Sequence, residues 1–427
     1  MFEKYIKERQ LIAVKKMALQ LLSEKGESNA RSMAVKLIEN YTSLDRQEQL
    51  KFFEFLAEKL SPDPELVFQA AKLYKDKVDE LSLIELQHVA DPPRQELFRR
   101  LNRAESGTKT IISMRESVLG HLKVKPKLRA LDADIEHLLT SWFNPGFLEL
   151  HEITWSSPAN LLEKIIKHES VHAIDGWEDL RRRLQPDRRC FAFFHPQLPQ
   201  EPLIFVEVAL VADIAKEVGA LLDKRAPTLD AKKYKTAIFY SISNCQPGLK
   251  GVSLGNFLIK RVAERIQKDI PSVKTFSTLS PVPGFLKWLD SGVNLSSYDL
   301  SSIKNKKLEK HIACLQLPKQ SWIKKISDGW NTDKSTPEEK AALLGLCFLY
   351  LTRDLHSSKG DAVARFHLAN GARLYSVNWA ADLSKKGLAQ SCGIMVNYLY
   401  ELPVLENNHQ AYINEEVIYS TNLEKLI

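Results

Sequence analysis

A glycine-rich stretch from Cys245 to Asn256 contains the residue types and spacing that most directly suggest chemistry. It follows a run rich in β-branched and aromatic residues, Thr236 to Asn244, and it precedes apolar residues at helical spacing. Glycines let a backbone approach a ligand closely, and free N–H groups at the start of a helix attract anions. The pattern predicts a helix from about Val252 to Lys268. The stretch itself is either a phosphate-binding loop or a tight turn that packs this helix on a sheet, and both interpretations remain open.

The spacing of the glycines fits neither of the two common nucleotide loops. No P-loop sequence and no Gly-x-Gly-x-x-Gly occurs. The segment does resemble the pyrophosphate-binding loop of GNAT-type acyltransferases, which opens a helix and holds the diphosphate of coenzyme A, although it is one residue longer. This resemblance implies coenzyme A contacts at Lys250, Gly251, Val252, Ser253, Leu254, Gly255 and Asn256.

A second pattern, His168-Glu169-Ser170-Val171-His172, matches the H-E-x-x-H of zinc peptidases. On one helix the two histidines would hold zinc while Glu169 activates water. However, Asp175-Gly176 predicts that the helix ends soon after His172, and the longer metzincin extension is absent. We interpret the match as accidental and predict no metal site.

Length, composition and charge limit the class of protein. With 427 residues, of which 44% are hydrophobic and 26% charged, the chain can bury the cores of two or more domains. A net charge of +7 suits a polyanionic small molecule, and the aromatic residues are not interleaved with basic runs as in single-strand binders. We therefore expect a small-molecule partner and no nucleic acid.

The cysteines and the apolar runs indicate a compartment. Five widely spaced cysteines, an odd number, argue against a disulfide framework or a thiolate metal site. No apolar run reaches the length of a membrane span, and the N-terminal residues lack the apolar core of a signal peptide. The sequence predicts a reduced, cytoplasmic protein without membrane attachment.

Two regions that differ in their pattern of apolar residues must position these motifs. Residues 1–145 carry apolar residues at helical spacing almost throughout, and Asp63-Pro64-Glu65 has the composition of a helix start. We predict a helical bundle for packing or assembly here. Over residues 146–427 strand-like and helical runs alternate, which predicts a mixed α/β domain. The strand-like runs include Phe147–Trp155, Cys190–Phe194, Leu203–Val211, Thr236–Asn244 and Cys392–Leu402.

Three features follow the glycine-rich stretch. Ser296 to Lys310 is polar and rich in lysine, which predicts a surface loop. Thr336-Pro337-Glu338-Glu339 is a capping box that predicts the helix carrying Leu343 to Leu351. His367 lies among apolar residues, where a single histidine is more often a hydrogen-bonded core residue than a catalytic residue.

Several separated segments together resemble the malonyl-CoA decarboxylase family. They occur in the order of the family and are Arg181–Pro196, Gly248–Gly255, Leu279–Phe285, Arg365–Ala372, Asn378–Asp382 and Ser391–Tyr400. The resemblance implies a helical N-terminal domain that helps to build a homotetramer, followed by a catalytic domain with the GNAT fold. It also implies conversion of malonyl-CoA to acetyl-CoA and carbon dioxide, without a metal or prosthetic group.

The same resemblance implies roles for three residues, with Ser280 as the active-site serine, His367 as the active-site histidine and Tyr400 as the tyrosine that supports it. Loss of carbon dioxide leaves an enolate beside the thioester, so the substrate is its own electron sink. Ser280 is expected to hold the carboxylate or to act as a base. His367, with an unperturbed pKa near 6.5, is expected to have both protonation states available at neutral pH and to deliver a proton. Ser253 departs from the family, because some relatives carry a glutamate there.

Two other classes of function remain open from the residues. A GNAT-type acyltransferase would need an acceptor amine, whereas a decarboxylase turns over malonyl-CoA alone. A non-catalytic helical scaffold that binds coenzyme A would bind tightly and release no carbon dioxide.

Overall fold

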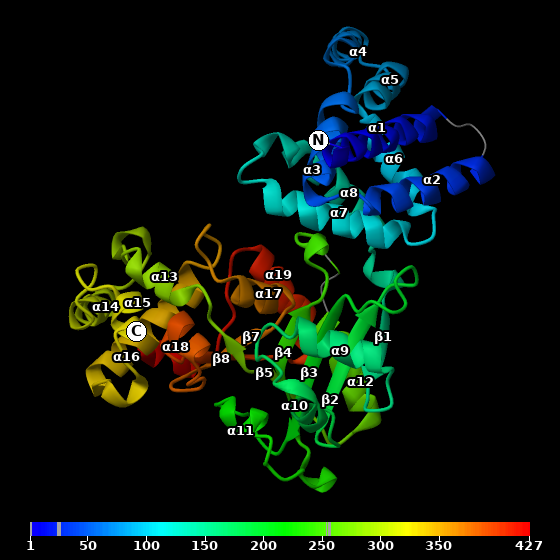
Figure 1. Cartoon of the computed structure of the whole chain (residues 1–427). Coiled ribbons are helices and arrows are strands. Elements are labelled where there is room, and N and C mark those ends of the chain that lie inside the picture. Colours follow the sequence, from blue (N-terminus) through cyan, green and yellow to red (C-terminus); the bar gives the residue numbers. More distant parts are fainter. Residues whose placement is uncertain (1, 24–26, 253, 255–257) are drawn as a thin grey trace. The chain divides into compact units, whose positions relative to one another are not determined.

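The computed structural model describes residues 2–23, 27–252, 254 and 258–427. By their internal contacts these residues divide into two compact units (Figure 1). The first unit comprises Met1–Glu149 together with the short segments Phe194–Glu201 and Cys245–Leu254, and the second comprises Leu150–Phe193, Pro202–Asn244 and Gly255–Ile427. The predicted order of a helical N-terminal region followed by a mixed sheet with helices is confirmed.

Helices make up almost the whole of the first unit. Leu56, Leu97, Ile111 and Ile135 are fully or almost fully buried and lie on four different helices of its core. The predicted helix start at Asp63 is confirmed, because its carboxylate accepts the first two free N–H groups of α4. The helices are α1 (Phe2–Ser23), α2 (Glu27–Thr42), α3 (Arg46–Lys59), α4 (Pro64–Lys77), α5 (Glu80–Ala90), α6 (Pro93–Asn102), α7 (Gly107–His121) and α8 (Arg129–Trp142).

The α4–α5 hairpin differs from the other helices of this unit in what it exposes. Its two helices contact each other, yet only Ala70 and Ser82 are buried. Six large apolar side chains of the hairpin are exposed, namely Leu66, Phe68, Leu73, Val78, Leu81 and Ile84. Several exposed large apolar side chains on two neighbouring helices are typical of an interaction surface.

One mixed sheet organises the second unit (Figure 1). In the described residues it has eight strands in the order β1-β2-β3-β4-β5-β8-β6, with β7 also paired to β8. Strands β2, β3 and β4 are antiparallel, β4 and β5 are parallel, and β8 is antiparallel to β5, β6 and β7. The strands are β1 (Glu149–Ile153), β2 (Arg188–Phe194), β3 (Ile204–Val211), β4 (Thr236–Asn244), β5 (Thr275–Thr278), β6 (Ser280–Pro281), β7 (Arg373–Asn378) and β8 (Met395–Leu399).

The helices of the second unit confirm one prediction and correct two. The capping box at Thr336 and Glu339 is present and starts α16. The helices are α9 (Ala159–His168), α10 (Gly176–Arg183), α11 (Gly219–Leu222), α12 (Leu258–Asp269), α13 (Phe285–Asp290), α14 (Ser302–Cys314), α15 (Trp322–Ser327), α16 (Pro337–Arg353), α17 (Ala362–Ala369), α18 (Lys385–Ser391) and α19 (Leu405–Ile413).

The two corrections concern polar and glycine-rich sequence. The segment predicted as a surface loop forms most of α14, because the Ser301 side chain caps it and Leu308 anchors its apolar side. The helix predicted to begin near Val252 does not include Val252 or Leu254, since both are non-helical, and the described part of α12 begins at Leu258. Val252 instead closes a turn by donating to the carbonyl of Leu249.

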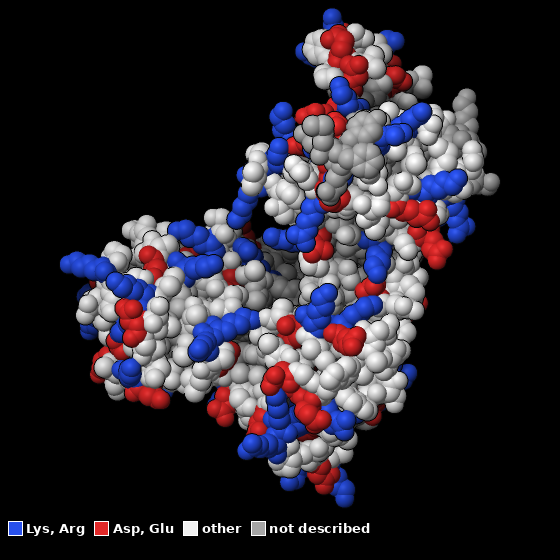
Figure 2. Space-filling model, in the orientation of Figure 1, with Lys and Arg blue, Asp and Glu red and all other residues white. Residues whose placement is uncertain are grey.

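No single charge dominates the face of the molecule in Figure 2. On the face in Figure 2, lysine and arginine side chains are interspersed with aspartate and glutamate. Among the described helices, none has both the length and the apolar character needed to cross a membrane.

Candidate functional site

Ser280, His367 and Tyr400 are distant in sequence but form one hydrogen-bonded chain in the second unit. The Ser280 hydroxyl oxygen lies 2.9 Å from Nε2 of His367, and Nδ1 of the same ring lies 2.9 Å from the Tyr400 hydroxyl oxygen. All three side chains are buried. The structure therefore brings together Ser280 and His367, which the family resemblance assigns to the acyl end of the substrate, and Tyr400, which it assigns as the support of the histidine.

Three different elements hold this chain of hydrogen bonds. Ser280 begins β6 and pairs with Val396 of β8. Tyr400 directly follows β8, and its N–H donates to the carbonyl of Phe276 on β5. His367 lies in the last turn of α17. Two residues at the sheet and one on a packed helix are thus fixed relative to each other by backbone hydrogen bonds and helix packing.

Asp361 links the serine and histidine segments. One of its carboxylate oxygens caps α17 by accepting the N–H groups of Val363 and Ala364, at 2.9 and 3.0 Å. The other oxygen accepts the N–H of Gly284, four residues after Ser280, at 2.9 Å. Asp361 is almost fully buried, and burial raises the pKa of its carboxyl group. One carboxylate therefore holds both the helix that carries His367 and the turn that follows Ser280.

Gly284 is required at this turn for reasons of space. A Cβ atom there would come within 2.2 Å of the Tyr350 hydroxyl oxygen and 3.2 Å of the Asp361 carboxylate. Because the first distance is shorter than any van der Waals contact, a side chain at Gly284 would displace Tyr350 or break the bond to Asp361.

A cavity of about 300 Å³ opens beside the Ser280–His367 pair. It lies where the parallel strands β4 and β5 separate, since their pairing ends at Phe239 and Thr278. Apart from Ser280 and His367 its walls are mainly apolar, and they include Val171, Ile204, Phe239, Ile242, Pro281, Ala362, Val363 and Phe366. A small, largely apolar cavity with a few polar groups is the usual form of a small-molecule site.

A β-bulge shapes one wall of this cavity. Glu207 pairs with Ser241 while the next residue of β3, Val208, pairs with Phe239, so Tyr240 is the extra residue of β4. Bulges change the direction of neighbouring side chains and are frequent near active sites. Here four consecutive residues of β4, Phe239 to Ile242, contribute to the lining.

Burial changes the acid–base properties of the site. The His367 ring is fully enclosed and stacks on the Tyr398 ring at 4.7 Å between centroids. Burial lowers the pKa of His367 to about 3 and raises that of the Tyr400 hydroxyl well above its usual value. The expectation that His367 has both protonation states available at neutral pH is therefore wrong, because removing the imidazolium from water costs too much. The imidazole is neutral, with one nitrogen that donates and one that accepts.

The H-E-x-x-H segment does not form the helix that a zinc peptidase needs. Helix α9 ends at His168, and Glu169 has an extended backbone. One carboxylate oxygen of Glu169 accepts the N–H groups of Val171 and His172, and the other accepts the Ser241 and Ser243 hydroxyls. Within the described residues, no group of three or more His, Cys, Asp or Glu side chains is arranged to hold a metal ion.

The predicted coenzyme A loop is described only in part. Lys250, Gly251, Val252 and Leu254 are described, whereas Ser253, Gly255 and Asn256 lie outside the described residues. Gly251 has φ of +86°, a conformation that favours glycine. Val252 and Leu254 are buried and Lys250 is exposed. The coenzyme A contacts of this loop therefore stay a prediction.

The glycine at the start of this stretch has a packing role. Gly248 lies so close to α7 that a Cβ atom would come within 2.1 Å of the Ile112 carbonyl oxygen. Its own carbonyl accepts from the buried Arg115 guanidinium, which also pairs with Asp132 and Glu136. Gly248 thus packs against α7, which differs from the predicted packing of the following helix on the sheet, so this contact confirms neither interpretation of the stretch.

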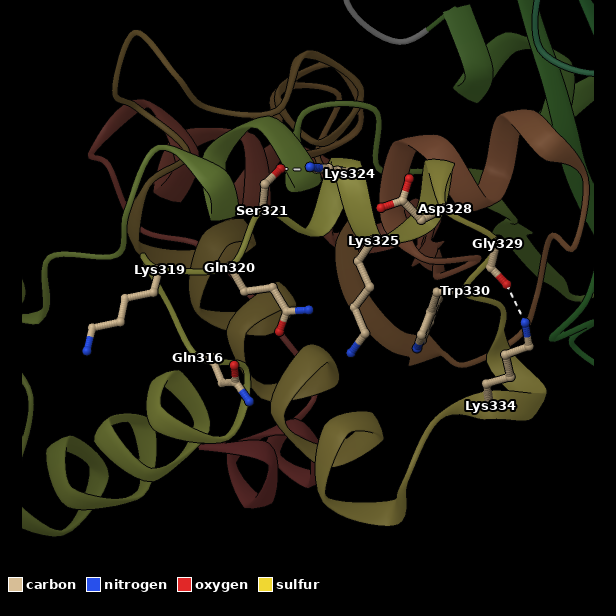
Figure 3. Close-up of a pocket in the computed structure, with 10 residues that line it drawn as sticks. All are labelled: Gln316, Lys319, Gln320, Ser321, Lys324, Lys325, Asp328, Gly329, Trp330 and Lys334. Carbon is tan, nitrogen blue, oxygen red and sulfur yellow. Dashed lines mark hydrogen bonds between the residues drawn. The ribbon is translucent and has the colours of Figure 1, made fainter.

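A second, larger cavity lies in the second unit around α15 and has four lysines in its lining (Figure 3). Its ammonium groups do not converge on one point. Lys325 pairs with Glu339, Lys334 donates to the carbonyl of Gly329, and Lys319 points away from the other labelled side chains. These lysine side chains therefore form no defined anion site, whereas the polar groups of the Ser280–His367 cavity are held by hydrogen bonds.

Sequence reasoning missed two residues that support the site, Asp361 and Thr278. Thr278 is fully buried, and its hydroxyl oxygen lies 2.9 Å from that of Ser280. A signal was present for both residues. Positions two apart on a strand face the same side, and an aspartate before an apolar helical run is a typical N-cap.

The fold and the site together define an α/β protein with a buried serine–histidine pair facing a small cavity between diverging parallel strands. The family model for the malonyl-CoA decarboxylase C-terminal domain matches residues 146–427, and that for the N-terminal domain of the same family matches residues 60–143. The chain belongs to the malonyl-CoA decarboxylase family.

Individual relatives agree with this assignment. The chain is similar to the crystal structure of malonyl-CoA decarboxylase from Rhodopseudomonas palustris, with 42% identity, a TM-score of 0.84 and coverage of 98% of this chain and 99% of that one. The corresponding structure from Agrobacterium vitis gives 41% identity, a TM-score of 0.81 and coverage of 97% and 99%. The mitochondrial malonyl-CoA decarboxylase of Anser anser anser is 37% identical over 346 residues, which are 78% of this chain and 69% of the relative.

Proposed function

We propose that this protein decarboxylates malonyl-CoA to acetyl-CoA and carbon dioxide at the Ser280–His367 cavity. The observation that carries the proposal is the hydrogen-bonded chain from Tyr400 through His367 to Ser280, at the wall of a small apolar cavity. Membership of the malonyl-CoA decarboxylase family supports the choice of substrate.

The reaction has three requirements that the protein must meet. The carboxylate must leave perpendicular to the thioester plane, the enolate oxygen needs hydrogen bonds, and carbon needs one proton. The C–C bond breaks, its electron pair stays on the thioester as an enolate, and carbon dioxide departs. Apolar walls such as Phe239 and Val363 favour this step, since they solvate a spread charge better than a compact carboxylate.

Each residue of the pair then has a role. Ser280 lies at the cavity wall and orients the malonyl group beside Nε2 of His367, and His367 delivers the proton to the enolate carbon. The neutral ring delivers this proton from one nitrogen while the other nitrogen accepts, so the step does not need the imidazolium form that burial disfavours. Tyr400 supports the other ring nitrogen. The substrate provides the electron sink, so the step needs no metal or prosthetic group.

The GNAT fold and the coenzyme A loop belong to the same proposal. A mixed sheet whose parallel strands β4 and β5 separate at the cavity supports a GNAT-like catalytic domain. The diphosphate of coenzyme A is proposed to bind the backbone from Lys250 to Asn256. The Gly251 conformation supports a close approach there.

Assembly and location complete the proposal. We propose that the helical region builds a homo-oligomer, in line with the tetramer implied by the family resemblance, and the exposed apolar side chains of the α4–α5 hairpin support it. The interspersed charges in Figure 2 support a small-molecule partner and offer no basic stripe for nucleic acid on that face. Cytoplasmic location and involvement in fatty-acid metabolism remain predictions.

Incubation of the purified protein with malonyl-CoA alone tests this function. A decarboxylase releases carbon dioxide and acetyl-CoA without an acceptor, whereas an acyltransferase needs an amine and a scaffold binds without turnover. His367→Asn is expected to lower kcat by roughly 10²–10⁴, the usual contribution of general acid–base catalysis. Ser280→Ala should also lower kcat, and the double variant should lose less than the product of the two effects. A fully active but destabilised His367→Asn protein would contradict the proposed role.

A further inference from the structure

Neutral His367 can carry its proton on either ring nitrogen, and the choice decides what the site can do. Nε2 faces Ser280 at the cavity wall, whereas Nδ1 faces Tyr400 away from it. Only a proton on Nε2 lies on the side from which a bound acyl group can receive it. The tautomer of a histidine is set by the hydrogen bonds at its two nitrogens.

The hydroxyl of Ser280 cannot donate to two partners at once. It donates to the Thr278 hydroxyl oxygen at 2.9 Å. A serine hydroxyl has one proton and two lone pairs, so the Ser280 oxygen meets Nε2 of His367 as an acceptor. Nε2 must then be the donor, and the accepting nitrogen is Nδ1, which faces the Tyr400 hydroxyl.

The Thr278 hydroxyl oxygen accepts a backbone donor as well. The N–H of Tyr398, which can only donate, is bonded to the Thr278 hydroxyl oxygen at 3.1 Å. The Thr278 carbonyl accepts the side-chain amide of Asn397 at 2.6 Å, and that amide also donates to Ala215. Thr278 is therefore held on both its side chain and its backbone.

We propose that Thr278 is a positioning residue that holds His367 in the tautomer protonated at Nε2, by taking the Ser280 proton for itself. The donors then run in one direction, from Tyr400 to His367, to Ser280 and to Thr278. This arrangement of protons does not depend on the proposed decarboxylation, but its effect on the rate does.

The proton balance of the proposed reaction follows from this direction. After carbon dioxide leaves, Nε2–H gives its proton to the enolate carbon while Nδ1 receives the Tyr400 proton. The phenolic proton then returns from Nδ1 to Tyr400, and Nε2 takes a proton from water entering the cavity. The hydroxide that remains adds to carbon dioxide as bicarbonate or is neutralised in the solvent. One proton is consumed overall, and it appears in the methyl group of acetyl-CoA.

Selective ¹⁵N labelling of histidine in the full chain tests the tautomer without any need for turnover. The His367 signals are identified by their loss in His367→Asn. In the wild-type protein we expect Nε2 to show the pyrrole-type shift of a protonated nitrogen and Nδ1 the pyridine-type shift. A protonated Nδ1 in the wild-type protein would overturn the proposal.

Variants at Thr278 test the cause. Thr278→Val removes the acceptor, so Ser280 should donate to Nε2, the pattern of the two shifts should reverse, and kcat should fall by about tenfold or more with a smaller change in KM. Thr278→Ser keeps the hydroxyl and should retain the wild-type pattern and most of kcat. An unchanged pattern in a folded Thr278→Val protein, or a reversed one in Thr278→Ser, would refute the role of Thr278.

A matched control separates this role from a general effect of Thr→Val in a buried strand. Thr236 is buried at the start of β4. It is not one of the two residues, Ser280 and Tyr400, whose hydroxyl groups lie beside the ring nitrogens of His367. Thr236→Val should leave the His367 shifts and kcat unchanged. If the wild-type protein shows the predicted tautomer but does not turn over malonyl-CoA, the proposed function fails while the tautomer assignment stands.

Discussion

Replacing Asp361 with serine should separate helix capping from the link between the two halves of the site. Serine caps a helix about as well as aspartate, so α17 keeps an acceptor for Val363 and Ala364. The second carboxylate oxygen is lost, and with it the bond to the N–H of Gly284. The variant therefore keeps the helix and releases the turn that follows Ser280.

The magnitudes follow from the contacts. A hydrogen bond to a charged group contributes about 1.5–3 kcal/mol, but burial of the carboxyl group, which raises its pKa, offsets part of this. We expect the free energy of unfolding to fall by about 2 kcal/mol. If the Ser280 hydroxyl then moves by about 1 Å relative to Nε2 of His367, kcat should fall by roughly 10², with a smaller change in KM.

Steady-state kinetics and thermal melts on the same preparation measure both effects. Ser301→Ala, which removes the cap of α14 on another part of the second unit, is the control for a lost cap and should cost about 1 kcal/mol without a change in kcat. Asp361→Asn should behave like the serine variant, because its amide places a donor toward one of the N–H groups. Equal kcat values for Asp361→Ser and Ser301→Ala would refute the reasoning.

Two further predictions concern the loop and the hairpin. Gly251→Val should raise KM for malonyl-CoA, because its side chain would block the approach of the backbone to the diphosphate and would also press on the Glu136 carboxylate, 2.7 Å from a Cβ atom there. Gly329→Val, at a similar φ of +94° and with nothing within 4 Å of its Cβ position, controls for backbone strain alone. Equal KM values in the two variants would remove the loop from the site. Phe68→Glu combined with Leu81→Glu should lower the sedimenting mass without lowering kcat, because these side chains are 65% and 79% exposed. The control Ile303→Glu, at 79% exposure on α14, should change neither the mass nor kcat. An unaltered mass in the double variant would argue against the hairpin as the contact between subunits.

Local structure was accessible from the sequence because it depends on neighbours a few residues apart. The cap at Asp63, the capping box at Thr336 and Glu339, and the strand from Thr236 to Asn244 were all predicted at the positions where they occur. Each reflects the pairing of backbone groups within one turn or along one run. The same logic failed over Ser296–Lys310, where lysines suggested a loop and one buried leucine with a serine cap sufficed for a helix.

Which residues meet was a different kind of question. Ser280 and His367 are 87 positions apart, and His367 and Tyr400 are 33 apart. Family resemblance named these residues, but periodicity alone left His367 as an ordinary core histidine. Their contact depends on the register of β6 and β8 and on the packing of α17, which no local pattern encodes.

Sequence by itself thus determined the order of elements, their caps and the residue types available for chemistry. The tertiary structure decided the charge state of that chemistry, because only complete enclosure lowers the pKa of His367 to about 3. It also decided that Thr278 and Asp361 serve the site, since their importance comes from oxygen atoms placed within hydrogen-bond distance by strands and helices far away in the chain.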